Sequence, residues 1–197
     1  SSITNPRTKV QAYMTTNYHY YDSKWGVYSD PESGVEYADN DERFIFFTRT
    51  IIETCLLLGW FPDIVHCNDW QTSLLAMYMR TLYREQFKNT KIILTIHNIN
   101  NQGVFPLKST FAKTGLPQDS IDSVKHKNQF NFLKAGILYA DRITTVSETY
   151  GQELLNDAKL TNGLNSCLRE RKDVFHPILN GIDTTVWDPE KDKLITK

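Results

Sequence analysis

The sequence has few cysteines and no arrangement of them that would form a structural framework. Three cysteines occur in 197 residues, widely spaced, with no Cys-x-x-Cys pair and no Asn-x-Ser/Thr glycosylation site. This argues against a disulfide-stapled secreted domain and favours a reducing compartment. The N-terminus also shows no signal-peptide pattern. We therefore expect a cytoplasmic protein.

Long hydrophobic runs and an excess of one charge are both missing. Apolar runs reach about five or six residues, whereas a spanning helix needs about 20. Lysine and arginine total 22 against 23 aspartate and glutamate, a net charge of −1. We therefore expect neither a membrane nor a nucleic-acid partner. The glycine motifs of Rossmann and P-loop nucleotide sites are absent as well, and no cofactor is expected.

One stretch combines a buried strand with a polar break. Ile92 to Ile96 are apolar or β-branched at every position, which is typical of a strand in a parallel sheet covered by helices. His97 and Asn98 follow directly, and Gln102 and Gly103 close the segment. Ligands of open α/β sheets bind beyond the carboxyl ends of the strands. We expect His97 and its neighbours to contact a ligand, and the ligand to be a sugar.

Strands and helices are predicted to alternate along most of the chain. In the first long helix, for example, apolar residues recur every three or four positions and Gly59 follows the last of them. The expected strands cover 9–14, 62–67, 92–96, 142–146 and 176–179, and the expected helices cover 40–58, 70–83, 118–123, 130–140, 148–155 and 166–171. This order predicts an α/β fold with a parallel sheet and right-handed crossovers.

Polar groups follow four of the predicted strands: Asn68 with Asp69, His97 with Asn98, Ser147 with Glu148, and the segment 180–183. Because parallel strands end at the same edge of a sheet, these groups predict a binding crevice. His97 could bond a sugar hydroxyl, act as a general base, or only satisfy loop backbone. Asp69 could accept from sugar hydroxyls, cap the following helix, or do both.

Two further patterns have competing interpretations. His66 and Cys67 are successive strand residues that point to opposite faces, so a metal site is not expected. Residues 17–37 form a predicted irregular loop rich in tyrosine, with Trp25 among its aromatics. A loop of this length is often functional. Its rings could stack on a glucan chain, or they could pin the loop to the body of the protein.

Six segments together resemble the bacterial glycogen synthase and plant starch synthase family in order and spacing. They are Asp39–Phe44, Pro62–Trp70, Thr95–Asn98 with Gln102–Phe105, Phe132–Gly136, Ala140–Ser147, and Ile178–Asp183 with Trp187–Pro189. The resemblance covers nearly the whole chain and matches most of the N-terminal half of the family's catalytic unit.

The resemblance implies a GT-B glycosyltransferase, in which two Rossmann-like domains face a cleft. The fold class is α/β, a three-layer Rossmann-like parallel sheet. Residues 1–183 would form part of the N-terminal, acceptor-side domain, and residues 184–197 would begin the interdomain linker. The implied partners are ADP-glucose, an α-1,4-glucan and the C-terminal domain of the same enzyme. The implied location is the cytoplasm, or the plastid stroma in a plant or alga.

The resemblance also assigns site residues. His97 and Asp69 match catalytic cleft residues, and no metal or cofactor is implied. The predicted substrate-binding residues are Asn98, Gln102, Tyr21 and Asn68. The sequence departs from the family at several places. It has no Lys-x-Gly-Gly-Leu donor loop, and Asn68 stands where many members have histidine.

Glucose would be transferred, with retention, to the non-reducing end of the glucan, and the activity would need segments outside this chain. Two alternatives remain open at this stage. One is a non-catalytic glucan-binding module. The other is a different retaining GT-B glucosyltransferase that uses UDP-glucose.

Overall fold

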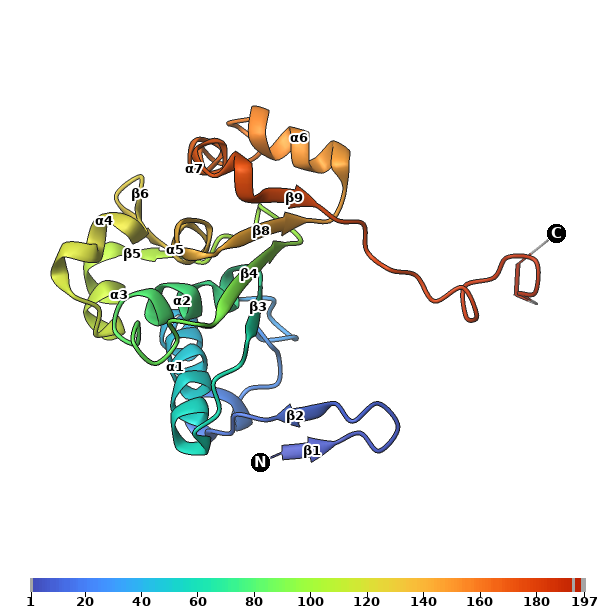
Figure 1. Cartoon of the computed structure of the whole chain (residues 1–197), viewed down its shortest axis with the longest axis horizontal. Coiled ribbons are helices and arrows are strands. Elements are labelled where there is room, and N and C mark those ends of the chain that lie inside the picture. The colour runs from blue at the N-terminus through green and yellow to red at the C-terminus, as the bar shows by residue number, and fades with distance from the viewer. Residues whose placement is uncertain (1, 193, 196–197) are drawn as a thin grey trace.

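The computed structural model describes residues 2–192 and 194–195. Its centre is a four-stranded sheet in the order β3-β4-β8-β9 (Figure 1). The strands are β3 (Ile64–Asn68), β4 (Lys91–Ile96), β8 (Arg142–Thr145) and β9 (Phe175–Pro177). All three neighbouring pairs are parallel. The predicted α/β fold with a parallel sheet is therefore confirmed.

The main helices pack on the sheet and on one another. They are α1 (Asn40–Leu58), α2 (Asp69–Arg80), α5 (Phe132–Tyr139), α6 (Glu148–Asn156) and α7 (Asn165–Glu170). Helix α2 contacts β3 and β4, and α1 and α5 both pack on α2. The close approach of α5 to α2 needs Gly136, because a Cβ there would lie 2.6 Å from Ser73 Oγ. The core is continuous through these helices and the sheet.

The two faces of the sheet differ. Leu94 lies beside α5, and Thr145 lies beside α6, so by strand alternation these residues and their i±2 neighbours face the helices. The helices that Figure 1 draws beside β3 and β4 gather on this side. The other face carries His66, whose Nε2 lies 2.6 Å from Thr95 Oγ1. Thr95 Oγ1 in turn lies 2.6 Å from Thr144 Oγ1. A row of hydrogen-bonded polar side chains therefore lies on the face of the sheet opposite these helices.

Short elements fill the rest of the described chain. Strands β1 (Ser2–Thr4) and β2 (Gln11–Tyr13) form an antiparallel pair, so the strand predicted over 9–14 exists but lies outside the parallel sheet. Strands β5 (Val104–Pro106), β6 (Lys125–His126) and β7 (Gln129–Asn131) form a second, antiparallel sheet. The remaining elements are η1 (Tyr18–Asp22), α3 (Leu107–Thr114), η2 (Gln118–Ser120), α4 (Ile121–Val124) and η3 (Lys172–Val174).

The predicted helix ends are right in some places and wrong in others. Gly59 ends α1 in the left-handed conformation, and the Ser147 side chain caps α6 by accepting from Tyr150 N–H. Asp39 precedes α1 without a side-chain cap bond, and its Oδ2 pairs with Lys24 Nζ at 3.1 Å. The helix predicted to reach residue 83 ends at Arg80.

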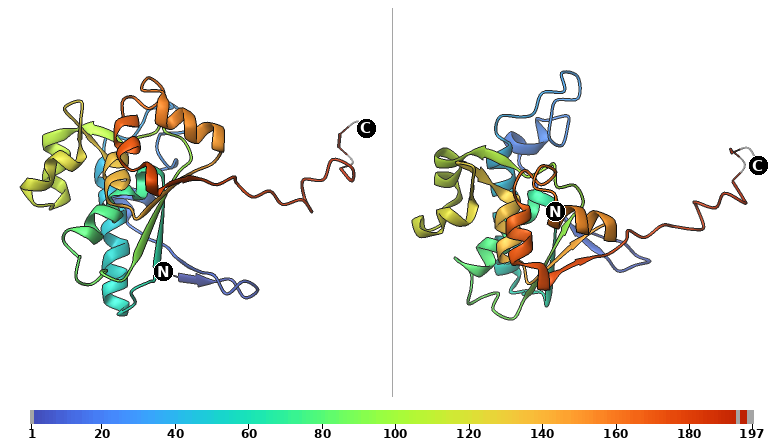
Figure 2. Two further views of the ribbon diagram at one scale, coloured as in Figure 1. Left: turned by 45° about the horizontal axis from the view of Figure 1, so that its top comes forward. Right: turned by 90° about the horizontal axis from the view of Figure 1, so that it is seen from above.

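After β9 the chain leaves the body as an extended segment (Figures 1 and 2). Ile178 N–H still donates to Thr145 C=O at 2.7 Å, and the residues beyond it are mostly exposed. The assignment of 184–197 to an interdomain linker stays a prediction. Residues 193, 196 and 197 of that range lie outside the described residues.

Gly103 is a position where the fold leaves no room for a side chain. Its φ is +62°, and an added Cβ would lie 2.3 Å from the Trp70 ring. We expect Gly103→Ala to lower the free energy of unfolding by about 2–4 kcal/mol, because the left-handed backbone and the overpacked indole both add cost. Urea denaturation measures this. Gly34→Ala is the matched control, since Gly34 has φ +68° but open space around it. Equal losses at both positions would contradict the steric explanation.

Candidate functional site

The carboxyl ends of the four parallel strands lie at one edge of the sheet, as predicted. Asn68 ends β3, His97 follows β4, Val146 follows β8 and Ile178 follows β9. The segment 180–183 lies farther along, where the chain leaves the body (Figure 2). There the Asp183 carboxylate accepts from Thr185 N–H and Oγ1–H, within its own turn. The predicted polar groups that lie at this edge are therefore those that follow β3, β4 and β8.

Asp69 has an unusual conformation at this edge. Its φ is +55°, in the left-handed region that aspartate visits more readily than most residues. Its Oδ1 accepts a hydrogen bond from the backbone N–H of His97 at 2.8 Å. Asn68 precedes α2 and makes no side-chain cap bond, while Asp69 is the first residue of the helix, so the capping interpretation of Asp69 is wrong. Asp69 instead joins the ends of β3 and β4.

His97 is exposed, and its backbone is held in place. Its Nε2 lies 3.1 Å from Asn68 Oδ1, so the end of β3 also contacts the imidazole. The Asn98 side chain accepts from Asn100 N–H within the loop. Ile99 N–H donates to the Tyr150 hydroxyl of α6 at 2.9 Å. The structure thus places Asn68, Asp69, His97 and Asn98 together.

Gln102 lies inside the protein and is only 4% exposed. Its Nε2 donates to Ile99 C=O at 3.0 Å and to Thr161 C=O at 2.9 Å. Its Oε1 accepts from Asn131 Nδ2 at 2.9 Å. The loop of residues 97–103 is here called the His97 loop. Gln102 fastens the far end of this loop to the protein, and both of its side-chain amide hydrogens are used in doing so.

An aromatic cluster around Trp70 packs against the end of the His97 loop at Gly103. The Trp70 ring centroid lies 4.7 Å from that of Phe44, 5.8 Å from Phe105 and 5.5 Å from Phe132. Tyr28 of the N-terminal loop lies 6.5 Å away. Because Trp70 follows Asp69 directly, the packing of this one indole places the start of α2 and the end of the His97 loop together.

Tyr21 packs against α1. Its hydroxyl donates to Arg43 C=O at 2.8 Å, and its ring lies 6.3 Å from Phe46. Burial raises the pKa of Tyr21 to about 12, against the opposing effect of the Arg43 guanidinium. The phenol therefore stays protonated near neutral pH and serves as a hydrogen-bond donor in this position.

Among the described residues, no group of three His, Cys, Asp or Glu side chains is arranged to hold a metal ion. Cys67 is buried, and burial raises the pKa of its thiol to about 12. His66 points to the opposite face, toward Thr95. Within the same residues, no helix has the length and apolar character needed to cross a bilayer.

A family model described as the starch synthase catalytic domain matches residues 2–170. The chain belongs to this family. The glycogen synthase of Chlorobaculum tepidum is 41% identical over 196 residues, which cover 98% of this chain and 39% of the relative. The glycogen synthase of Elusimicrobium minutum is 46% identical over 166 residues, which cover 81% and 34%. The chain therefore spans about two fifths or less of the length of these relatives.

A solved structure gives the same assignment to the starch synthase catalytic domain family. The catalytic domain of starch synthase IV from Arabidopsis thaliana, bound to ADP and acarbose, matches with a TM-score of 0.70 and 32% identity. The match covers 84% of this chain and 35% of that chain. The GT-B family resemblance stated from the sequence motifs is therefore confirmed.

Sequence reasoning missed two parts of the site. The positive φ of Asp69 was not predicted, because a Ser, Thr, Asn or Asp before an apolar helix ordinarily signals an N-cap. The Tyr150 hydroxyl was missed because Tyr150 was counted only as part of a helix. Its position three residues after the capping Ser147 places it on the first turn of α6, beside the sheet edge.

Removing the Asp69 carboxylate should free the His97 loop. We expect Asp69→Ala to lower the free energy of unfolding by about 1–3 kcal/mol, since it deletes the acceptor for His97 N–H and places alanine at positive φ. Asp69→Asn keeps an acceptor and tolerates the same φ, so its loss should be smaller. Hydrogen exchange of the His97 amide reports the bond directly. Unchanged His97 protection in Asp69→Ala would show that the bond is not formed in solution.

Proposed function

We propose that this chain is part of the acceptor-side domain of a starch or glycogen synthase. In this proposal the whole enzyme transfers glucose, with retention, from ADP-glucose to the non-reducing end of an α-1,4-glucan. The observation that carries it is the exposed His97 imidazole, held at the sheet edge by Asp69 and Asn68. The names of the similar glycogen synthases and the ADP and acarbose of the similar starch synthase support it.

The arrangement suggests a role for each site residue. If Nε2–H of His97 donates to Asn68 Oδ1, Nδ1 is left as an acceptor for a sugar hydroxyl. We propose that His97 contacts the transferred glucose and that Asp69 fixes His97 through its backbone. Asn98 and Asn68 are exposed and are proposed as sugar contacts. Gln102 and Tyr21 stay predicted substrate-binding residues, although in this structure their polar groups bond within the protein.

The departing nucleoside diphosphate requires positive charge nearby, because negative charge develops on it in the transition state. The residues grouped at this edge, Asn68, Asp69, His97 and Asn98, include no lysine or arginine. The chain also spans 39% of the length of the Chlorobaculum relative. We therefore propose that a C-terminal domain reached through residues 184–197 supplies the cations. The proposed location is the cytoplasm, or a plastid stroma.

Two other functions fit part of the same observations. A non-catalytic glucan-binding module would use exposed aromatic side chains, and Trp25 is one. A related retaining glucosyltransferase would use UDP-glucose in place of ADP-glucose. Assaying the full-length enzyme that carries this chain with each donor separates these from the main proposal. Turnover with ADP-glucose alone supports it, and turnover with neither donor favours a binding module.

His97→Ala in the full-length enzyme should lower kcat for glucan elongation by about 100-fold or more, because a group that contacts the reacting sugar is removed. His176→Ala is the matched control, since His176 is also exposed at a strand of the same sheet. Its kcat should equal that of the wild type. A His97→Ala rate within a factor of about two of wild type would remove His97 from the mechanism.

The 197-residue chain alone should show no measurable elongation of glycogen from ADP-glucose, because the diphosphate-binding cations are proposed to lie elsewhere. Radiolabelled glucose incorporation measures this with high sensitivity. The full-length enzyme, assayed in parallel, controls for the substrates. Steady turnover by the chain alone would place a complete active site within these residues.

A further inference from the structure

The irregular loop of residues 23–36, here called the Trp25 loop, is rigidly anchored although it projects from the body. In the right view of Figure 2 it stands out as a blue loop away from the sheet. Ser29 and Glu36 form an isolated antiparallel bridge across it. Within this small hairpin, Gly34 N–H donates to Asp30 C=O at 2.8 Å and Asp30 N–H donates to Val35 C=O at 3.0 Å.

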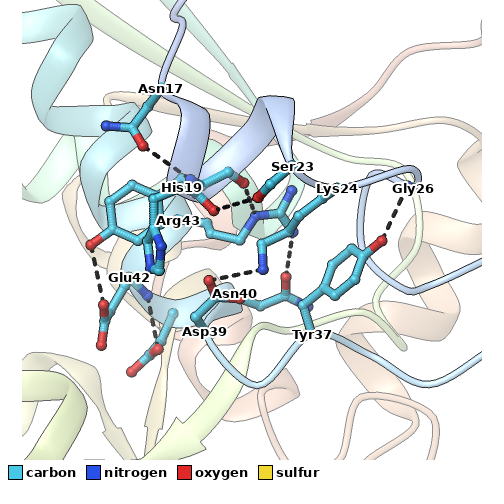
Figure 3. Close-up of polar contacts among 12 residues, drawn as sticks. Asn17, His19, Ser23, Lys24, Gly26, Tyr37, Asp39, Asn40, Glu42 and Arg43 are labelled. Carbon is cyan, nitrogen blue, oxygen red and sulfur yellow. Dashed lines mark hydrogen bonds and ion pairs between the residues drawn. The ribbon is translucent and has the colours of Figure 1, made fainter.

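Both neighbours of Trp25 in the sequence are fixed by Tyr37 and Asp39 (Figure 3). Lys24 Nζ lies 3.1 Å from Asp39 Oδ2 and 4.6 Å from the centroid of the Tyr37 ring. Gly26 N–H donates to the Tyr37 hydroxyl at 3.2 Å. A Cβ at residue 26 would lie 2.0 Å from Ser29 C=O, so the turn there needs glycine. The backbone that carries the Trp25 indole is therefore held on both sides.

Arg43 fastens the base of the loop to α1. It is almost fully buried, at 3% exposure, and its guanidinium points into the loop in Figure 3. Nη1 donates to Val27 C=O at 2.9 Å, and Nε donates to Tyr20 C=O at 2.7 Å. A buried arginine bonded to backbone carbonyls fixes the course of a loop, because leaving its donors unpaired would cost much more.

Although the backbone of the Trp25 loop is held in place, Trp25 itself is 92% exposed. The other aromatic residues of this region behave differently. Tyr28 packs on Phe44 and Trp70, and Tyr37 accepts from Gly26. Tyr28 and Tyr37 therefore pin the loop, which was one of the two interpretations of the sequence, while the Trp25 indole is left in solvent. A large exposed ring on a preorganised loop is typical of a binding surface.

The indole borders two hollows of different chemistry. One has a volume of about 280 Å³ and is lined by Trp25, Asp30, Pro31 and Glu32. The other has a volume of about 300 Å³ and is lined by Trp25 and residues that include Tyr21, Lys24 and Phe44. An aromatic face beside carboxylates suits a sugar ring, whose C–H face is apolar and whose hydroxyls donate hydrogen bonds. Small-molecule sites commonly combine aromatic walls with a few such polar groups.

The Trp25 loop is also joined to the proposed active-site edge. Tyr28 of the loop lies 6.5 Å, between ring centroids, from Trp70, and Trp70 follows Asp69 in α2. Aromatic packing therefore connects the Trp25 loop to the start of α2, where Asp69 lies.

We propose that Trp25 is a stacking platform for a chain of α-1,4-linked glucose, with Glu32 and the Oδ2 atom of Asp30 accepting from its hydroxyls. The Oδ1 atom of Asp30 already accepts from Glu32 N–H and Ser33 N–H within its own turn. The inference rests on the proposed function and adds a glucan contact outside the catalytic residues. Because Lys24 and Gly26 already hold the backbone, binding needs little ordering of the loop, which favours affinity. Rigid aromatic side chains give large contact area at small entropic cost.

The test titrates the 197-residue chain with maltoheptaose by isothermal calorimetry. Trp25→Ala should weaken the Kd by about tenfold, and Trp25→Tyr, which keeps a ring, should stay within about threefold of wild type. Trp60→Ala is the matched control, because Trp60 is also exposed but lines neither hollow. Its Kd should not change. Urea midpoints of all variants establish that each is folded.

Equal Kd values for wild type and Trp25→Ala, or no binding of maltoheptaose by the wild-type chain, would overturn the proposal. In the full-length enzyme Trp25→Ala should raise the KM for glucan with kcat unchanged. A wild-type KM in that variant would mean that another surface covers the indole, which also contradicts the proposal. If the full-length enzyme elongates no glucan while the chain binds maltoheptaose through Trp25, the proposed transfer fails and the binding platform stands.

Discussion

The hydrogen bond from His97 N–H to the Asp69 carboxylate is the constraint on which the candidate site depends. It spans the ends of two adjacent parallel strands, and the Asp69 that accepts it has a left-handed backbone. That same backbone turn starts α2 and sends Trp70 into the core, where the indole meets the end of the His97 loop at Gly103. Local strain at Asp69 is thus offset by packing, as is common at functional sites.

Two buried polar side chains organise the loops around this edge. Arg43 directs the N-terminal loop through backbone carbonyls, and Gln102 fastens the His97 loop to two other segments. Each donates to backbone carbonyl groups of irregular segments, where no ladder of secondary structure fixes the chain. The two loops then meet at the Trp70 cluster through Tyr28. The loops around this edge contain little regular secondary structure. Aromatic packing and buried side-chain hydrogen bonds therefore set their positions.

Periodicity and strand-end polarity were sufficient to predict the parallel sheet and the grouping of Asn68, Asp69, His97 and Asn98. Elements of two or three residues such as β6 and β7 were missed, because so short a stretch carries no periodic signal. The capping interpretation of Asp69 failed because aspartate is favoured both at an N-cap and at positive φ.

The contact between Gly103 and Trp70 has a consequence for how this sequence can change over time. With no room for even a methyl group above the indole, position 103 can gain a side chain only after position 70 loses bulk. A smaller residue at 70 would in turn leave a void among Phe44, Phe105 and Phe132. The two positions are 33 residues apart in the numbering and must therefore change together. This coupling limits the order in which substitutions near the site can be accepted.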